Sequence, residues 1–190
     1  MAISRWKGSE AGFSLPETVV ATAIMAASVA ALGQLFAVAV ASNRGARYTT
    51  YAASLAVQKM EQLRGLTYGF DALALPITDV STNSAVYPAN PTGGTGLSAS
   101  PSGALTTNTA GYVDFIDQYG KQIGSGSTSV PTGTVYTRRW SIEPLPTNPN
   151  NTILVQVVVT RFRNQSVGVL STGRSPDEAR LVSIKTRKAQ

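Results

Sequence analysis

The sequence of 190 residues contains neither cysteine nor histidine. Without cysteine the chain has no disulfide and no thiolate nucleophile, and without histidine it lacks the commonest general base and the commonest metal ligand of proteins. Neither a Cys/His nor a Ser/His/Asp arrangement can be built from the remaining residue types. We therefore expect a protein that is not an enzyme and that holds no cofactor and no metal.

Charge is also absent from a long stretch near the N-terminus. No charged residue occurs between Thr18 and Asn43, and about 20 apolar residues are enough to cross the hydrocarbon core of a bilayer. One carboxylate, Glu17, stands at the head of this run, where a lone charge needs a positive partner. If the chain were cut between Gly12 and Phe13, the new α-amino group of Phe13 would be such a partner. Because this amine would point off the end of its own helix, the carboxylate could neutralise the amine of a neighbouring copy.

Residues 12–17 have the sequence Gly-Phe-Ser-Leu-Pro-Glu, and they follow a short basic segment and precede an apolar helix. This arrangement resembles the class III signal of type IV pilins and type II secretion pseudopilins. The resemblance implies that an inner-membrane prepilin peptidase cuts after Gly12, that the same enzyme methylates the amine of Phe13, and that Glu17 guides the subunit into a helical filament. Pro16 stands where many relatives have isoleucine. A proline in a first helical turn removes only an amide that has no intrahelical partner, so the departure is tolerable.

Two further segments resemble the PilV-type minor pilins. Residues 55–64 resemble the end of their helix, and that of the related minor pseudopilins, while residues 136–142 resemble part of their sheet. A minor pilin of a type IV pilus is therefore the favoured interpretation, and a minor pseudopilin of a type II secretion system is the alternative. A major pilin is disfavoured because many major pilins carry a disulfide near the C-terminus. Residues 66–111 resemble nothing in the family.

The resemblance divides the chain into a class III leader (1–12), a transmembrane and filament-core helix (13–43), an amphipathic continuation of that helix (44–65) and a β-rich head (66–190). Arg5 and Lys7 outnumber Glu10 in the leader, which predicts a cytoplasmic N-terminus. We expect the chain in the bacterial inner membrane before assembly, and in a periplasmic or cell-surface filament afterwards. The expected partners are other pilins through the N-terminal helix, the prepilin peptidase and methyltransferase, and the inner membrane.

Two other interpretations leave residues 12–17 unexplained. The first is a secreted β-domain binding module, with Arg5 and Lys7 in the basic region of an ordinary signal peptide and a cleavage site at Ala39-Val40-Ala41. The apolar region of such a signal runs over about 7 to 15 residues, and the apolar region here is longer. The second is a plain transmembrane anchor in which Glu17 is incidental.

The residues from Phe13 to about Leu63 predict one continuous helix, which Gly65 ends. Apart from Glu17, its charged residues lie in the second half, at Arg44, Arg47, Lys59, Glu61 and Arg64. Among them, apolar residues recur at spacings of three and four, which indicates a stripe that packs on a sheet. The stripe comprises Tyr48, Tyr51, Ala52, Leu55, Ala56, Met60 and Leu63.

The last third of the chain predicts an antiparallel sheet of three or four strands, so the expected fold class is α+β. Val135–Glu143, Ile153–Phe162 and Ala179–Thr186 are rich in β-branched and aromatic residues, and residues 168–176 form a connection. In the second strand, Ile153, Val155, Val157 and Val159 alternate onto the face assigned to the helix stripe. Residues 66–111, with four prolines and a glycine run at 93–96, predict a long irregular excursion without a phosphate loop.

Basic residues gather in the last third of the chain, within a formal net charge of +6. They are Arg138, Arg139, Arg161, Arg163, Arg174, Arg180, Lys185, Arg187 and Lys188. DNA binding is the less favoured interpretation, because Arg138 and Arg139 point to opposite faces of a strand; solvated strand edges are favoured. The acidic pairs Asp114 with Asp117 and Asp177 with Glu178 lack the spacing of a calcium loop, so we expect turn or cap roles for them.

Overall fold

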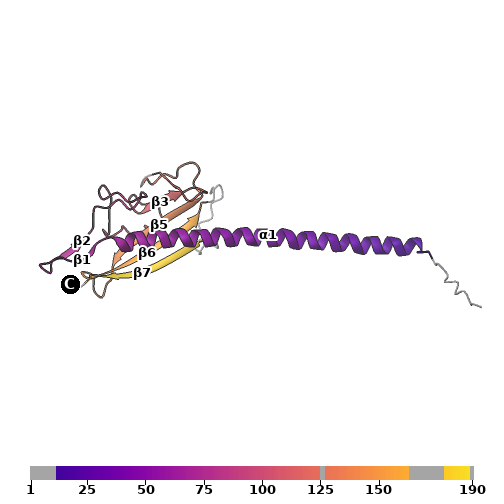
Figure 1. The fold of residues 1–190 in the computed structure, drawn as a ribbon, viewed down its shortest axis with the longest axis horizontal. Helices are drawn as coiled ribbons and strands as arrows, with labels where there is room; N and C mark the ends of the chain where they lie inside the picture. Colours follow the sequence, from indigo (N-terminus) through magenta and orange to yellow (C-terminus); the bar gives the residue numbers. More distant parts are fainter. Residues whose placement is uncertain (1–11, 125–126, 163–177, 189–190) are drawn as a thin grey trace, which may run out of the picture. The chain divides into compact units, whose positions relative to one another are not determined.

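The computed structural model describes residues 12–124, 127–162 and 178–188, and it confirms the α+β fold class (Figure 1). Within these ranges, one long helix, α1 (Leu15–Gly65), is followed by seven strands. The chain divides into two compact units, residues 1–44 and residues 45–190, and each is described by itself. Some residues named in the sequence predictions lie outside the described residues. They are the predicted leader apart from Gly12, the connection 168–176, Arg163, Arg174 and Asp177.

The strands of the second unit form two sheets. They are β1 (Tyr68–Phe70), β2 (Pro76–Thr78), β3 (Val113–Ile116), β4 (Gln122–Ile123), β5 (Tyr136–Pro144), β6 (Thr152–Arg161) and β7 (Glu178–Thr186). β1 and β2 form a hairpin, and the other five form an antiparallel sheet in the order β4-β3-β5-β6-β7.

The three predicted strands correspond to β5, β6 and β7 with boundaries that differ by one residue, whereas the expected sheet of three or four strands was too small. β3 and β4 were missed because β4 has two residues and β3 carries an aspartate, so neither gives an apolar alternation.

The core of the second unit lies between the last part of α1 and one face of the larger sheet. Five residues of the predicted stripe are buried in it: Ala52, Leu55, Ala56, Met60 and Leu63. Ile153, Val155, Val157 and Val159 of β6 are buried in the same cluster, as predicted, together with Trp140 and Ile142 of β5. Burying one large apolar side chain is worth about 1.5 to 3 kcal/mol, so this contact holds the helix on the sheet.

Two members of the stripe are less buried than the others. Tyr51 is exposed at the side of the helix, where its ring lies 5.6 Å from that of Tyr136, and Tyr48 is only half-buried.

Residues 66–111 form the predicted irregular segment, interrupted by the β1–β2 hairpin. Its backbone is held by hydrogen bonds to itself, such as Leu97 N to Asp79 O at 2.7 Å and Gly96 N to Thr82 O at 2.8 Å. An added Cβ at Gly94 would lie 2.1 Å from the Cα of Asn83, so the glycine run serves the close approach of two backbone segments. It is a packing feature of the loop.

Candidate functional site

The beginning of α1 carries the residues singled out from the sequence. Gly12, Phe13 and Ser14 precede the helix, and the carbonyl of Ser14 accepts hydrogen bonds from the amides of Glu17 (3.0 Å) and Thr18 (3.1 Å). Ser14 is therefore the residue from which the helical hydrogen-bonding pattern starts. Pro16 lies within the first turn, where its missing amide leaves no intrahelical acceptor unpaired.

Glu17 lies in the first helical turn, where a negative charge interacts favourably with the helix dipole by about 0.3 to 1 kcal/mol. Its side chain is exposed, and Phe13 is 82% exposed. In the described ranges, no cation lies within ion-pair distance of Glu17. The carboxylate thus has no counter-charge inside this part of the chain and is open to one from outside it.

Among the described residues, nothing requires glycine at position 12. A Cβ built there would meet none of their atoms within 4 Å. A requirement for glycine at this position would therefore come from a binding partner that contacts the backbone.

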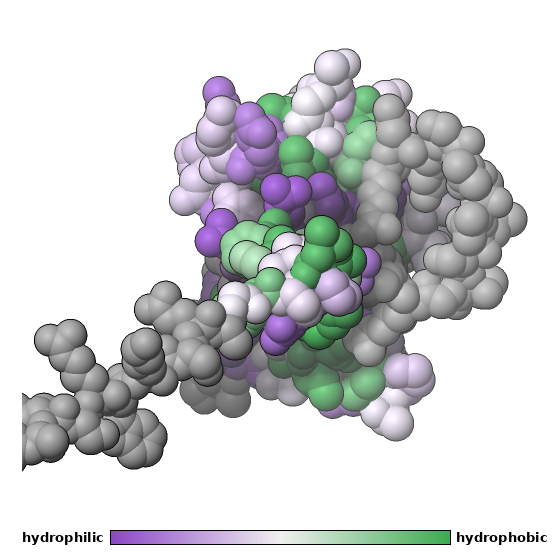
Figure 2. Space-filling model, turned by 90° about the vertical axis from the view of Figure 1, so that its right-hand side faces the viewer, coloured by the Kyte–Doolittle hydropathy of each residue, from purple (hydrophilic) through white to green (hydrophobic). Residues whose placement is uncertain are grey.

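The part of α1 that belongs to the first unit, up to residue 44, is apolar and exposed. Large side chains from Leu15 to Phe36 are exposed by between 57 and 78%. The helix is long and apolar enough to cross a membrane, by length and composition alone. Figure 2, which faces the end where the described helix begins, shows hydrophobic side chains at the molecular surface. Each such side chain gains about 1.5 to 3 kcal/mol when it is fully buried, so covering this segment with an apolar environment would be favourable.

The second unit contains a buried charge cluster that sequence reasoning missed. Lys59 Nζ lies 2.9 Å from Asp114 Oδ2, and Arg138 donates to both oxygens of Asp114, at 2.9 Å from Nε and 2.8 Å from Nη2. Lys59 and Asp114 are fully buried and Arg138 is 3% exposed. The ring centroid of Trp140 lies 4.3 Å from Lys59 Nζ, and Lys59 also donates to the carbonyl of Ser84.

This cluster corrects two expectations. Arg138 does not lie at a solvated strand edge, because it faces α1 and donates to the carbonyl of Leu55 at 3.0 Å. Asp114 has no turn or cap role, because it is the counter-charge of two buried cations. Arg139, on the opposite face as expected, is half-buried and donates to Asn108 Oδ1 at 2.9 Å.

Among the remaining acidic residues, Asp117 follows the prediction of a turn or cap role, whereas Glu178 lies in a strand. Asp117 has the expected turn role, since its Oδ1 accepts from the amides of Tyr119 (2.8 Å) and Lys121 (2.9 Å). Glu178 begins β7, where its carboxylate lies 3.5 Å from Arg180. No group of three metal-ligating side chains occurs within the part of the chain that the structure describes.

The charge cluster gives the second unit a specific pH dependence. Burial lowers the pKa of Lys59 to about 8, against an ordinary value of about 10.5, and the attraction of Asp114 only partly opposes this. Between these two values the unfolded chain binds more protons than the folded one, so the free energy of unfolding rises with pH. We expect the difference in unfolding free energy between wild type and Lys59→Met to rise by about 2 kcal/mol from pH 8 to pH 10.

Urea unfolding of residues 45–190 at several pH values measures this difference. A constant offset between the two proteins across that range would show that Lys59 does not titrate there.

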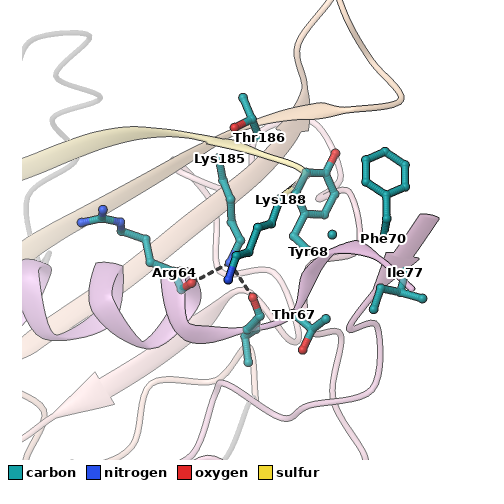
Figure 3. Close-up of a pocket in the computed structure, with 10 residues that line it drawn as sticks. Arg64, Thr67, Tyr68, Phe70, Ile77, Lys185, Thr186 and Lys188 are labelled. Atoms are coloured by element: carbon teal, nitrogen blue, oxygen red, sulfur yellow. Dashed lines mark hydrogen bonds between the residues drawn. The ribbon is translucent and has the colours of Figure 1, made fainter. Parts of the chain in front are cut away.

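A cavity of about 670 Å³ lies where α1 and β7 end (Figure 3). Lys185 reaches across it and donates to the carbonyls of Arg64 (2.6 Å) and Leu66, so it satisfies backbone acceptors at the end of α1. Gly65 is the last helical residue, as the sequence predicted to within one position. The rings of Tyr68 and Phe70 and the side chain of Ile77 form the apolar part of the lining.

No protein family, no curated protein and no solved structure matches the chain, so its place among known proteins has to be argued from residues 12–17 and the fold.

Proposed function

We propose that the chain is a minor pilin, a structural and assembly subunit of a type IV pilus. One observation carries the proposal: the Gly-Phe-Ser-Leu-Pro-Glu segment immediately precedes and begins a long, uncovered apolar helix whose last part packs on an antiparallel sheet. The resemblance of residues 12–17 to the class III signal supplies the roles. Prepilin peptidase cuts after Gly12, the amine of Phe13 is methylated, and Glu17 meets that amine in a neighbouring subunit.

The exposed part of α1 supports this role because its apolar side chains are uncovered. In a pilus subunit they would be covered first by lipid and then by neighbouring subunits. Residues 13–43 cross the inner membrane before assembly, and they pack against the same segment of other subunits afterwards. A minor pseudopilin of a type II secretion system is the second candidate, supported by the resemblance of residues 55–64 to the end of its helix.

The mature N-terminus distinguishes these filament subunits from a secreted module. We expect the mature chain to begin at Phe13 with a methylated α-amino group, and mass spectrometry of the mature chain measures this. Ala41 lies within α1, so a cut there would remove the apolar segment and most of the exposed helix. A mature chain that begins at Ser42 would contradict the proposal.

Processing should depend on the size of residue 12. We expect Gly12→Ala to be cut far better than Gly12→Val, because the peptidase must fit the backbone on the cytoplasmic side of the cut. The described part of the chain has room for either side chain, so a defect would report on the peptidase and not on the folding of that part. The measurement is the gel shift between precursor and mature forms, and equal processing of both variants would contradict the peptidase assignment.

A further inference from the structure

A second, smaller cavity of about 330 Å³ lies beside α1, and two exposed tyrosines line it. Tyr87 comes from the segment between β2 and β3 and is 68% exposed, and Tyr119 comes from the β3–β4 turn and is 81% exposed. Tyrosine is enriched among the residues that carry most of the binding energy of protein interfaces. We call this cavity, whose lining also includes Gln58 and Lys121, the tyrosine pocket.

The segments that carry the two rings are fixed by contacts within the second unit. Gln122 of β4 donates from Nε2 to the carbonyl of Ala85, two residues before Tyr87. The β3–β4 turn is held by the two amide hydrogen bonds described above, and a Cβ at Gly120 would lie 2.2 Å from the hydroxyl of Tyr51, so the turn packs closely on α1. Rings on fixed supports lose little conformational freedom when a partner binds.

The polar groups that the tyrosine pocket offers to a partner are mainly hydrogen-bond donors. The ammonium group of Lys121 is exposed and makes no ion pair within the described ranges. The side-chain oxygen of Gln58 already accepts from Arg138 at 3.2 Å, which leaves the N–H groups of its amide. The side-chain oxygen of Gln122 is buried. A ligand rich in acceptors and poor in donors therefore fits, because it leaves no donor of its own unpaired.

Residues 143–149, which we call the proline loop, have this complementary chemistry. They lead from the end of β5 into the β5–β6 connection, and most of them are exposed. Prolines have no N–H group, and within the described part of the chain the carbonyls of Pro146, Thr147 and Pro149 accept no hydrogen bond. The exposed carboxylate of Glu143 makes no ion pair in the same ranges. The loop thus offers acceptors, apolar rings and one negative charge.

The proline loop cannot reach the tyrosine pocket of its own chain. β5 starts beside the pocket, where Tyr136 is paired with Ile116 of the lining, and it ends at the proline loop. The 9 residues of this extended strand separate the two places by about 26 Å. A contact between the loop and the pocket therefore joins two copies of the chain.

We propose that the proline loop of one copy docks into the tyrosine pocket of another. The rings of Tyr87 and Tyr119 lie against prolines, as aromatic side chains do in grooves that recognise proline-rich segments. Lys121 pairs with Glu143 of the other copy. Two different surfaces take part, so the contact is heterologous and can repeat from copy to copy. It joins the globular units, and so it goes beyond the helix contacts of the proposed function.

The absence of cysteine allows a direct test, because two introduced thiols are the only ones present. Gln118→Cys, next to Tyr119, and Thr147→Cys are made in separate full-length chains with tags of different mass, and the chains are mixed in detergent micelles with diamide as the oxidant. Docking raises the effective concentration of the two thiols, so we expect at least about 10-fold more disulfide-linked heterodimer than from Gln118→Cys with Leu73→Cys. Leu73 is 79% exposed and lies outside both surfaces.

Further substitutions test the two parts of the contact. Lys121→Glu in the Gln118→Cys chain should lower the yield of heterodimer by about 2-fold to 5-fold, the range of an exposed ion pair, and Glu143→Lys in the Thr147→Cys chain should restore it. Lys188→Glu reverses an exposed lysine outside the pocket and is the matched control, without effect. Tyr119→Leu keeps an apolar side chain but removes the ring, and should lower the yield by about 5-fold or more.

Three results would overturn the proposal: a yield no higher than that of the Leu73→Cys pair, a yield unchanged by Tyr119→Leu, or a loss in Lys121→Glu that Glu143→Lys does not restore. A synthetic peptide of residues 143–149 should inhibit the crosslink. Binding of this peptide without any crosslink between whole chains would assign the pocket to a proline-rich segment of another protein, and would also overturn docking between copies. Cleavage after Gly12 is independent of all these results, so their failure leaves the proposed function standing.

Discussion

Asp114→Asn should lower the free energy of unfolding of residues 45–190 by at least about 3 to 5 kcal/mol, the cost of removing one partner from a buried ion pair. Asp114 is the counter-charge of two buried cations, Lys59 and Arg138, and both would be left without a carboxylate. A domain is stable by about 5 to 15 kcal/mol in total, so the variant should lose between about a fifth and all of its stability. Urea unfolding followed by the fluorescence of Trp140 measures the loss, because Trp140 lies against Lys59 and is the only tryptophan after residue 44.

Three variants show whether the loss comes from the unpaired charges. Asp117→Asn makes the same chemical change in a turn residue with hydrogen bonds to backbone amides only, and should cost about 1 kcal/mol or less. Lys59→Met leaves Asp114 paired with Arg138 and should be mild, since an apolar replacement in a buried charge cluster is often neutral. Adding Lys59→Met to Asp114→Asn should recover part of the loss. If Asp114→Asn unfolds within about 1 kcal/mol of wild type, the cluster does not hold the helix on the sheet.

This cluster also marks what the sequence could and could not predict. Lys59 lies at a stripe position, with Leu55 four residues before it and Leu63 four residues after it, so helical spacing alone indicates a buried lysine. Its partners were not predictable in the same way. Asp114 is directly opposite Arg138 across the β3–β5 pair, and that register exists only once β3 is recognised.

The long helix and the last three strands were predictable because their patterns extend over many residues. β3 and β4 are short, and their pairing depends on contacts distant in sequence, which local patterns do not contain. At the start of α1 the sequence supplied the whole candidate site. The structure adds that Gly12 has free space around it and that Glu17 has no counter-charge in the described part of the chain.

That isolated carboxylate is the basis of the second large effect. If Glu17 neutralises the amine of Phe13 in a neighbouring subunit, Glu17→Gln keeps the shape and the hydrogen-bonding capacity of the side chain but removes its charge. The amine would then be buried in the helix bundle without a counter-charge, at a cost of about 3 to 5 kcal/mol per contact. We expect the variant to be cut after Gly12 and to remain in the inner membrane, because losing a charge favours lipid. It should fail only at assembly.

Fractionation of sheared filaments against membranes compares wild type, Glu17→Gln and Glu61→Gln. Glu61 is an exposed acid farther along the same helix, 61% exposed and paired with Arg64, so its glutamine variant should enter filaments as wild type does. A plain membrane anchor predicts no defect in either variant, and a secreted module predicts a mature chain that lacks residue 17 altogether. Equal recovery of Glu17→Gln and Glu61→Gln in the filament fraction would contradict the neutralisation of a neighbouring Phe13 amine. The charge of Glu17 would then matter no more for assembly than the charge of Glu61, an exposed carboxylate on the same helix.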